Sequence, residues 1–72
     1  MTRIHASRTR HDLGLAAWFG GTLMGAVGLN GAAAAVGDPQ DRARVTSAGW
    51  AKWAPVSAAA IAAHLAGGAV IV

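Results

Sequence analysis

Residues 13–36 read LGLAAWFGGTLMGAVGLNGAAAAV, a run of 24 positions without an ionisable side chain. As an α-helix this run would extend about 36 Å, which exceeds the roughly 30 Å hydrocarbon core of a bilayer. Thr22 and Asn30 are its only clearly polar interruptions. Asp12 stands directly before the run and suits a helix N-cap. The sequence therefore predicts a transmembrane helix over residues 12–36, after a loose, polar and basic tail over residues 1–11.

A second apolar run, VSAAAIAAHLAGGAVIV, occupies residues 56–72 and contains only Ser57 and His64 as polar side chains. Seventeen residues lie at the lower limit of what can span a bilayer as a helix. The run predicts a second transmembrane helix over residues 55–72. It ends without a charged anchor. Either a partner caps this end or the chain continues beyond Val72, and we favour a continuing chain.

The connection over residues 37–54 has its own helix signals. Asp38 suits an N-cap, and Pro39 suits the first helical position because it lacks the N–H that would be unpaired there. We expect a short interfacial helix from Pro39 to Trp53, which Pro55 then kinks or breaks. The expected fold class is thus all-α, an integral membrane hairpin of two transmembrane helices with an interfacial helix in its connection.

Two tryptophans and a lysine close that connection. Trp50, Lys52 and Trp53 lie between the polar segment and the second apolar run. Tryptophan and lysine together are typical of the membrane–water interface, where an amphipathic side chain reaches both phases. We expect these three residues to act as interface anchors.

The composition favours helix packing in lipid over a water-soluble core. Hydrophobic residues make up 54% of the 72, but the chain has one Phe, no Tyr and 10 Gly, and much of its apolar content is alanine. Such small side chains fill a soluble core poorly, whereas they let helices approach closely in a membrane. The chain has no cysteine, which excludes disulfides and thiolate metal sites.

The formal charge of +3 comes from arginines and a lysine that flank the two apolar runs and never interrupt them. This distribution favours lipid headgroups, and it gives no basic stripe for nucleic acid. Three Lys or Arg precede the first run and three lie in the connection. The additional α-amino group favours a cytoplasmic N-terminus in the inner (plasma) membrane.

Small residues recur along one side of the first predicted helix at alternating spacings of three and four. This is the period of a left-handed helical seam, and GTLMG over residues 21–25 adds a GxxxG element. A glycine-rich helix also gives some such spacings by chance. We expect close helix packing along the stripe, which contains Gly14, Ala17, Gly21, Gly25, Gly28 and Ala32.

Two polar residues inside the predicted spans invite a functional interpretation. Asn30 is expected to form a structural hydrogen bond, because an unpaired amide is unfavourable in hydrocarbon. His64 lies near the middle of the second run, where an ionisable group is by default a functional hypothesis. We expect an interhelical hydrogen bond there. The alternative is an axial ligand for haem or a chlorophyll-type tetrapyrrole, since small residues flank the imidazole.

Enzymatic chemistry finds little support in the sequence. The carboxylates of Asp12, Asp38 and Asp41 are explained by helix capping, and no Ser or Thr lies in a recognisable triad pattern. We therefore expect a non-enzymatic chain with no resident metal and no small-molecule substrate.

The stretch DLGLAAWFGG over residues 12–21, followed by MGAVGLNG over residues 24–31, resembles uncharacterised actinobacterial, mycobacterial-type small membrane proteins. GWAKWAPV over residues 49–56 and AAHL over residues 62–65 are similar to the same family. The resemblance implies an accessory component of a large assembly, above all the respiratory cytochrome bc–cytochrome oxidase supercomplex. On this basis we expect a structural subunit whose partners are other membrane-protein subunits and the lipid bilayer.

Overall fold

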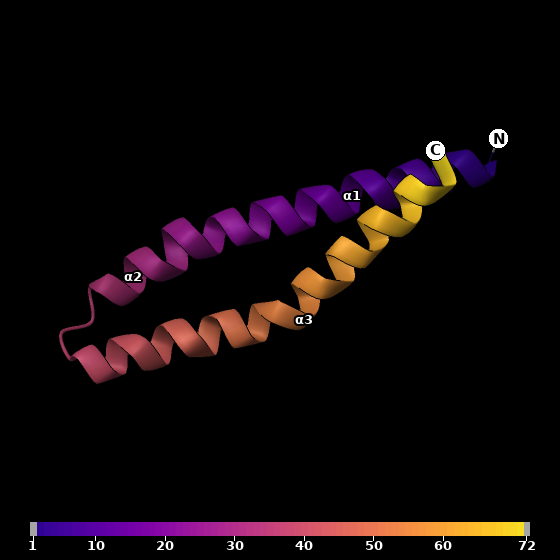
Figure 1. Cartoon of the computed structure of the whole chain (residues 1–72). Helices are drawn as coiled ribbons and strands as arrows, with labels where there is room; N and C mark the ends of the chain where they lie inside the picture. The colour runs from indigo at the N-terminus through magenta and orange to yellow at the C-terminus, as the bar shows by residue number, and fades with distance from the viewer. Residues whose placement is uncertain (1, 72) are drawn as a thin grey trace.

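The computed structural model describes residues 2–71 as two long helical arms folded into a hairpin (Figure 1). The first arm consists of α1 (Thr2–Met24), a π-helical turn η1 (Gly25–Leu29) and α2 (Asn30–Ala34), and the second arm is α3 (Pro39–Ile71). The hairpin measures 55 × 16 × 15 Å. Both arms are long and apolar enough to cross a membrane. The predicted all-helical hairpin is therefore confirmed.

The first arm begins ten residues earlier than expected, because α1 starts at Thr2 and runs through Asp12 without a break. The loose tail and the Asp12 N-cap were wrong predictions. Capping propensity is a local effect, whereas the basic segment is supported by packing against the other arm. The Ser7 backbone lies against Gly67 of α3, and Ser7 is only 2% exposed.

A π-helical turn interrupts the first arm at Gly25–Leu29, where the Asn30 N–H bonds to the Gly25 carbonyl five residues back. Such a turn holds one residue more than an α-helical turn, which rotates the following residues relative to the preceding ones. As a result Ala33, 2% exposed, faces the partner arm while Ala32 is exposed. After this turn, the small residue that faces α3 is therefore Ala33 and not Ala32, which the regular spacing predicted.

The connection between the arms is short and held by side chains. The Asp38 carboxylate accepts hydrogen bonds from the backbone N–H groups of Gln40 (2.7 Å) and Asp41 (3.3 Å), which confirms the predicted cap of the second arm. The Arg42 guanidinium donates to the Val36 carbonyl through Nε (3.0 Å) and one terminal nitrogen (2.9 Å). These bonds satisfy backbone groups that a helix end leaves unpaired.

The second arm is one continuous helix, since α3 runs from Pro39 to Ile71 with Pro55 in its interior. A separate interfacial helix ending at Trp53 is therefore not observed. Figure 1 shows α3 changing direction in its orange middle part. Proline removes one helical hydrogen bond and crowds the preceding turn, so a bend at Pro55 is the expected response of a helix that continues. The bend brings the end of α3 onto the start of α1 (Figure 1).

The two apolar runs are staggered in the hairpin. Gly14, near the start of the first run, lies against Ala60 and His64 of α3. The end of the second run lies beside the basic segment of α1, since Gly67 contacts Ser7 and His11. Only the beginnings of the two runs are therefore side by side, which their lengths alone did not indicate.

Candidate functional site

The candidate site is the seam between the arms, and its first part is a contact between two backbones. A Cβ added at Gly14 would lie 2.5 Å from the Ala60 carbonyl oxygen and 2.6 Å from the His64 nitrogen. A Cβ at Gly67 would likewise meet backbone atoms of Ser7 and His11. Glycine is needed at both positions because any side chain would push the helices apart.

The second part of the seam places aromatic rings where the first part has backbone. A Cβ added at Gly21 would overlap the indole ring of Trp53, and one at Gly25 would overlap that of Trp50. The two glycines of the GxxxG element thus form two adjacent seats for rings that lie three residues apart on α3. Farther along, Leu29 fills the space left by Gly49.

Both polar interruptions of the first apolar run find their partners in these indoles. The Trp50 Nε1–H donates to the Asn30 side-chain oxygen at 3.0 Å, and the Trp53 Nε1–H donates to the Thr22 hydroxyl at 3.3 Å. Each bond pairs a polar group that would otherwise be unsatisfied in an apolar environment. The hydrogen bond expected for Asn30 is present, although its donor is a tryptophan that we had expected at the membrane surface.

The predicted packing residues separate into two groups. Gly14, Gly21 and Gly25 face α3, as described above. Ala17 and Ala32 are exposed, and a Cβ on Gly28 would meet only the side chain of Met24 one turn earlier. At the end of the π-helical turn Leu29 packs on Gly49 of α3, and beyond the turn Ala33 is buried and Val36 is half-buried. The seam therefore continues through residues that the regular spacing did not select.

His64 belongs to a cluster at the end of the hairpin where the termini meet. Its Nδ1 donates to the His11 carbonyl at 3.0 Å, and its ring lies 4.2 Å from the His11 ring between centroids, with a 35° tilt. The Trp18 ring is 6.2 Å away. The interhelical hydrogen bond expected for His64 is present, but its partner is a backbone carbonyl at the edge of the basic segment.

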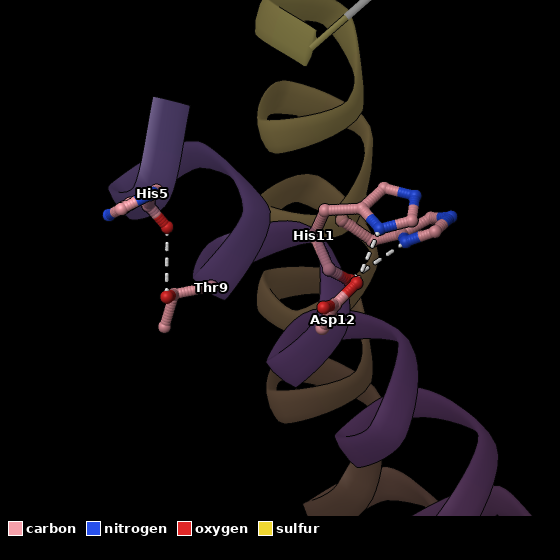
Figure 2. A network of polar contacts seen from close by, with 5 residues as sticks. His5, Thr9, His11 and Asp12 are labelled. Atoms are coloured by element: carbon pink, nitrogen blue, oxygen red, sulfur yellow. Dashed lines mark hydrogen bonds and ion pairs between the residues drawn. The ribbon is translucent and has the colours of Figure 1, made fainter. Parts of the chain in front are cut away.

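His11 is fixed in turn by its neighbour. The His11 Nδ1 lies 2.9 Å from the Asp12 carboxylate oxygen, and Figure 2 shows the ring reaching over Asp12. Earlier on α1, the Thr9 hydroxyl donates to the His5 carbonyl (Figure 2). The sequence analysis missed His11, because its partner is 53 residues away along the chain.

The geometry bears on the tetrapyrrole interpretation of His64. An axial ligand presents its free ring nitrogen to a broad, flat macrocycle, which needs open space around that nitrogen. The His11 ring stacks directly beside His64 and occupies part of this space. A macrocycle on His64 would thus require His11 to turn away. Haem or chlorin ligation stays a prediction, which a visible absorption spectrum of the purified protein tests.

Lys52 lies between the two seam tryptophans along α3 and is exposed. Trp50 and Trp53 are half-buried against the first arm, which does not prevent an indole from also reaching a headgroup region. The anchor role of these three residues stays a prediction. Their level on the hairpin is notable, because Gly21 and Gly25 place them beside the middle of the first apolar run.

The outward face of the hairpin carries most of the large apolar side chains. In the part of the chain that the structure describes, no large side chain is fully buried. On α1 an apolar hollow is lined by Leu15, Trp18, Phe19, Thr22, Leu23 and Ala26. Apart from Trp50, Trp53 and Leu29, which pack in the seam, the large apolar side chains face mostly the surroundings.

Chemically, the described residues offer packing surfaces and one pair of imidazoles. Among residues 2–71 no group of three or more His, Cys, Asp or Glu gathers that could hold a metal ion. No protein-family model, no curated protein and no solved structure matches the chain.

Proposed function

We propose that this chain is a non-catalytic structural subunit that inserts into a membrane as a closed hairpin and packs against a larger membrane protein. The observation that supports this best is the division of its surface. The seam satisfies its own polar groups through Trp50–Asn30 and Trp53–Thr22. Within the apolar runs, the large side chains that remain exposed are apolar, including Phe19 at 66% and Leu23 at 51% exposure. Such a surface suits lipid or an apolar partner helix.

The staggered apolar runs restrict how a closed hairpin can sit in a bilayer. Trp50 and Trp53 pack on Gly25 and Gly21 near the middle of the first run, so a core that covers this run also contains Lys52. A lysine near the midplane costs roughly 3 kcal/mol unless its side chain reaches a headgroup layer. We place the core between the level of Arg10 and the contact of Leu29 with Gly49. That distance is 19 residues along the first arm, or about 29 Å. Arg10 then lies at one headgroup layer. Lys52 lies inside the core, so its flexible side chain must extend toward the other layer.

The partner is expected on the α1 face that carries the apolar hollow. Leu15, Phe19 and Leu23 form successive turns of this face and are all exposed. Without a hydrophobic driving force in lipid, helices associate through shape-matched packing, and a hollow between bulky side chains offers such a shape. The resemblance of the sequence to accessory respiratory components makes a respiratory assembly the first partner to examine.

The test combines membrane extraction with co-purification. The full chain should stay in the membrane fraction after alkaline carbonate treatment. In mild detergent it should co-purify with one membrane assembly at fixed stoichiometry. The double substitution Phe19→Ala and Leu23→Ala should release the partner, whereas Val70→Ala, an exposed apolar position on α3, should retain it.

Three results would overturn the proposal. Release of the chain by carbonate would show that it does not span the membrane. Purification of the chain alone in mild detergent, or retention of the partner by the Phe19/Leu23 variant, would show that this face holds no subunit.

A further inference from the structure

The paired imidazoles of His11 and His64 have an arrangement that hydrogen bonding between helices does not require. Both rings use Nδ1 for a bond to oxygen, at 2.9 Å to Asp12 and at 3.0 Å to the His11 carbonyl. These bonds favour the tautomer with hydrogen on Nδ1, which leaves a lone pair on each Nε2. Neither Nε2 has a hydrogen-bond partner among the residues that the structure describes.

This pattern is the one found around histidines that bind metal. A metal-binding imidazole almost always donates its other N–H to a carboxylate or a backbone carbonyl, which fixes the ring orientation and raises the basicity of the ligand. Here one ring donates to a carboxylate and the other to a carbonyl. The two outer partners that such a site needs are thus already in place.

The rings lie slightly closer together than a shared ion requires. Two nitrogens that bind one tetrahedral ion at 2.0–2.1 Å are about 3.3 Å apart. The ring centroids are 4.2 Å apart, whereas two imidazoles that share one tetrahedral ion have centroids about 5 Å apart. The rings would therefore have to open by about 1 Å to bind an ion together. His11 is one-third exposed, which leaves room for this adjustment and for water ligands. Gly68 also keeps space open, because a Cβ there would lie 3.8 Å from the His11 Nε2.

We propose that His11 and His64 together bind one divalent transition-metal ion, Zn²⁺ or Cu²⁺, through their Nε2 atoms, with water completing the coordination. Imidazole nitrogen suits these ions, whereas Mg²⁺ and Ca²⁺ require oxygen ligands. The nearby Asp12 carboxylate offsets part of the added charge. Because the ligands come from opposite arms, the ion would join α1 to α3 at the open end of the hairpin.

The test titrates Zn²⁺ into the full chain in detergent. The wild-type chain should bind one ion saturably, and His11→Gln or His64→Gln should each abolish saturable binding. His5→Gln is the matched control, because His5 is on the same helix and is exposed. It should bind as wild type does. Asp12→Asn should weaken binding about 10-fold, the lower limit for loss of an outer partner.

Two further measurements separate a shared site from a folding effect. Cu²⁺ electron paramagnetic resonance should show an ion with two imidazole nitrogens in the wild type, and this signal should be absent from each single Gln variant. Energy transfer between dyes at Ala6→Cys and Ala69→Cys, both exposed positions, reports whether the hairpin is closed. Zn²⁺ at 100 times its Kd should lower the equilibrium constant for opening about 100-fold in the wild type. It should leave that constant unchanged in a closed His64→Gln hairpin.

The proposal would be overturned by wild-type Zn²⁺ affinity in either Gln variant, or by an equal loss of binding in His5→Gln. A single coordinated nitrogen in the wild type would also exclude the shared site. A wild-type opening equilibrium that does not respond to Zn²⁺ would also exclude the shared site. None of these outcomes bears on membrane insertion or on a protein partner.

Discussion

The two halves of the seam use small residues in opposite ways. At the end where the termini meet, Gly14 and Gly67 let the backbones of α1 and α3 touch. Toward the loop, Gly21 and Gly25 form seats for two indole rings. The same residue type therefore sets a close contact in one half and a wider, ring-filled contact in the other.

The difference shows how a hairpin with a bend stays in contact along its length. Figure 1 shows the arms converging toward the termini and separating toward the loop. A seam of glycine and alanine alone would lose contact as the arms diverge. Trp50 and Trp53 fill the wider part, and their N–H groups reach Asn30 and Thr22 on the opposite arm. In this half, indole rings and their hydrogen bonds join the arms in place of a close contact between backbones.

The largest effect is expected where backbone meets backbone. Gly14→Leu would place a side chain against the Ala60 carbonyl and the His64 nitrogen, neither of which can move by a rotamer change. We expect a loss of about 3 kcal/mol in the free energy of hairpin opening, the upper part of the usual range for overpacking. Energy transfer between dyes at residues 6 and 69 measures this free energy during titration with a denaturing detergent.

Gly20→Leu is the matched control, because a Cβ at Gly20 would meet nothing within 4 Å. It should leave the opening free energy unchanged or slightly raised, since glycine is a poor helix former. Equal losses for the two substitutions would contradict the distinction between seam and outer face.

The second prediction concerns the π-helical turn, after which Ala33 and not Ala32 faces α3. Ala33→Leu should destabilise the hairpin by about 2 kcal/mol, because Ala33 is 2% exposed and faces α3. Ala32→Leu should be close to neutral, since Ala32 is exposed. The same dye measurement compares the two variants. A larger loss for Ala32→Leu would mean that the regular three-and-four stripe, without the extra residue, describes the first arm.

The hairpin itself could be predicted from the sequence, because 24 residues without charge and a second apolar run have few other solutions. Gly14, Gly21 and Gly25 could be selected from their spacing. The exposure of Ala32 could not be predicted, because the residue types do not show that one helical turn contains an extra residue. The start of α1 was also missed. Asp12 is a strong local cap, whereas the docking of Ser7 on Gly67 depends on a residue 60 positions away.

The roles of the tryptophans show the same limit. Trp50 and Trp53 next to Lys52 match the usual membrane-surface pattern, and the sequence contains nothing that selects Gly21 and Gly25 as their seats. That pairing follows from the register of the hairpin, which places Trp53 beside Gly21 and Gly14 beside Ala60. Likewise, His11 becomes notable only once His64 lies beside it.

The smallest effect is expected from removing one indole N–H in the ring-filled half. Trp53→Phe keeps an aromatic ring over Gly21 and deletes the bond to the Thr22 hydroxyl, which is 3.3 Å long. Interhelical hydrogen bonds in membranes average about 0.6 kcal/mol, so the opening free energy should fall by roughly that amount. Trp50→Phe, which loses the 3.0 Å bond to Asn30, should cost somewhat more because it leaves an amide unpaired. Trp18→Phe is the control, since among the described residues the Trp18 indole, unlike those of Trp50 and Trp53, makes no hydrogen bond to the other arm. A loss for Trp53→Phe as large as that for Gly14→Leu would show that the hydrogen bonds, and not the close backbone contact, hold the arms together.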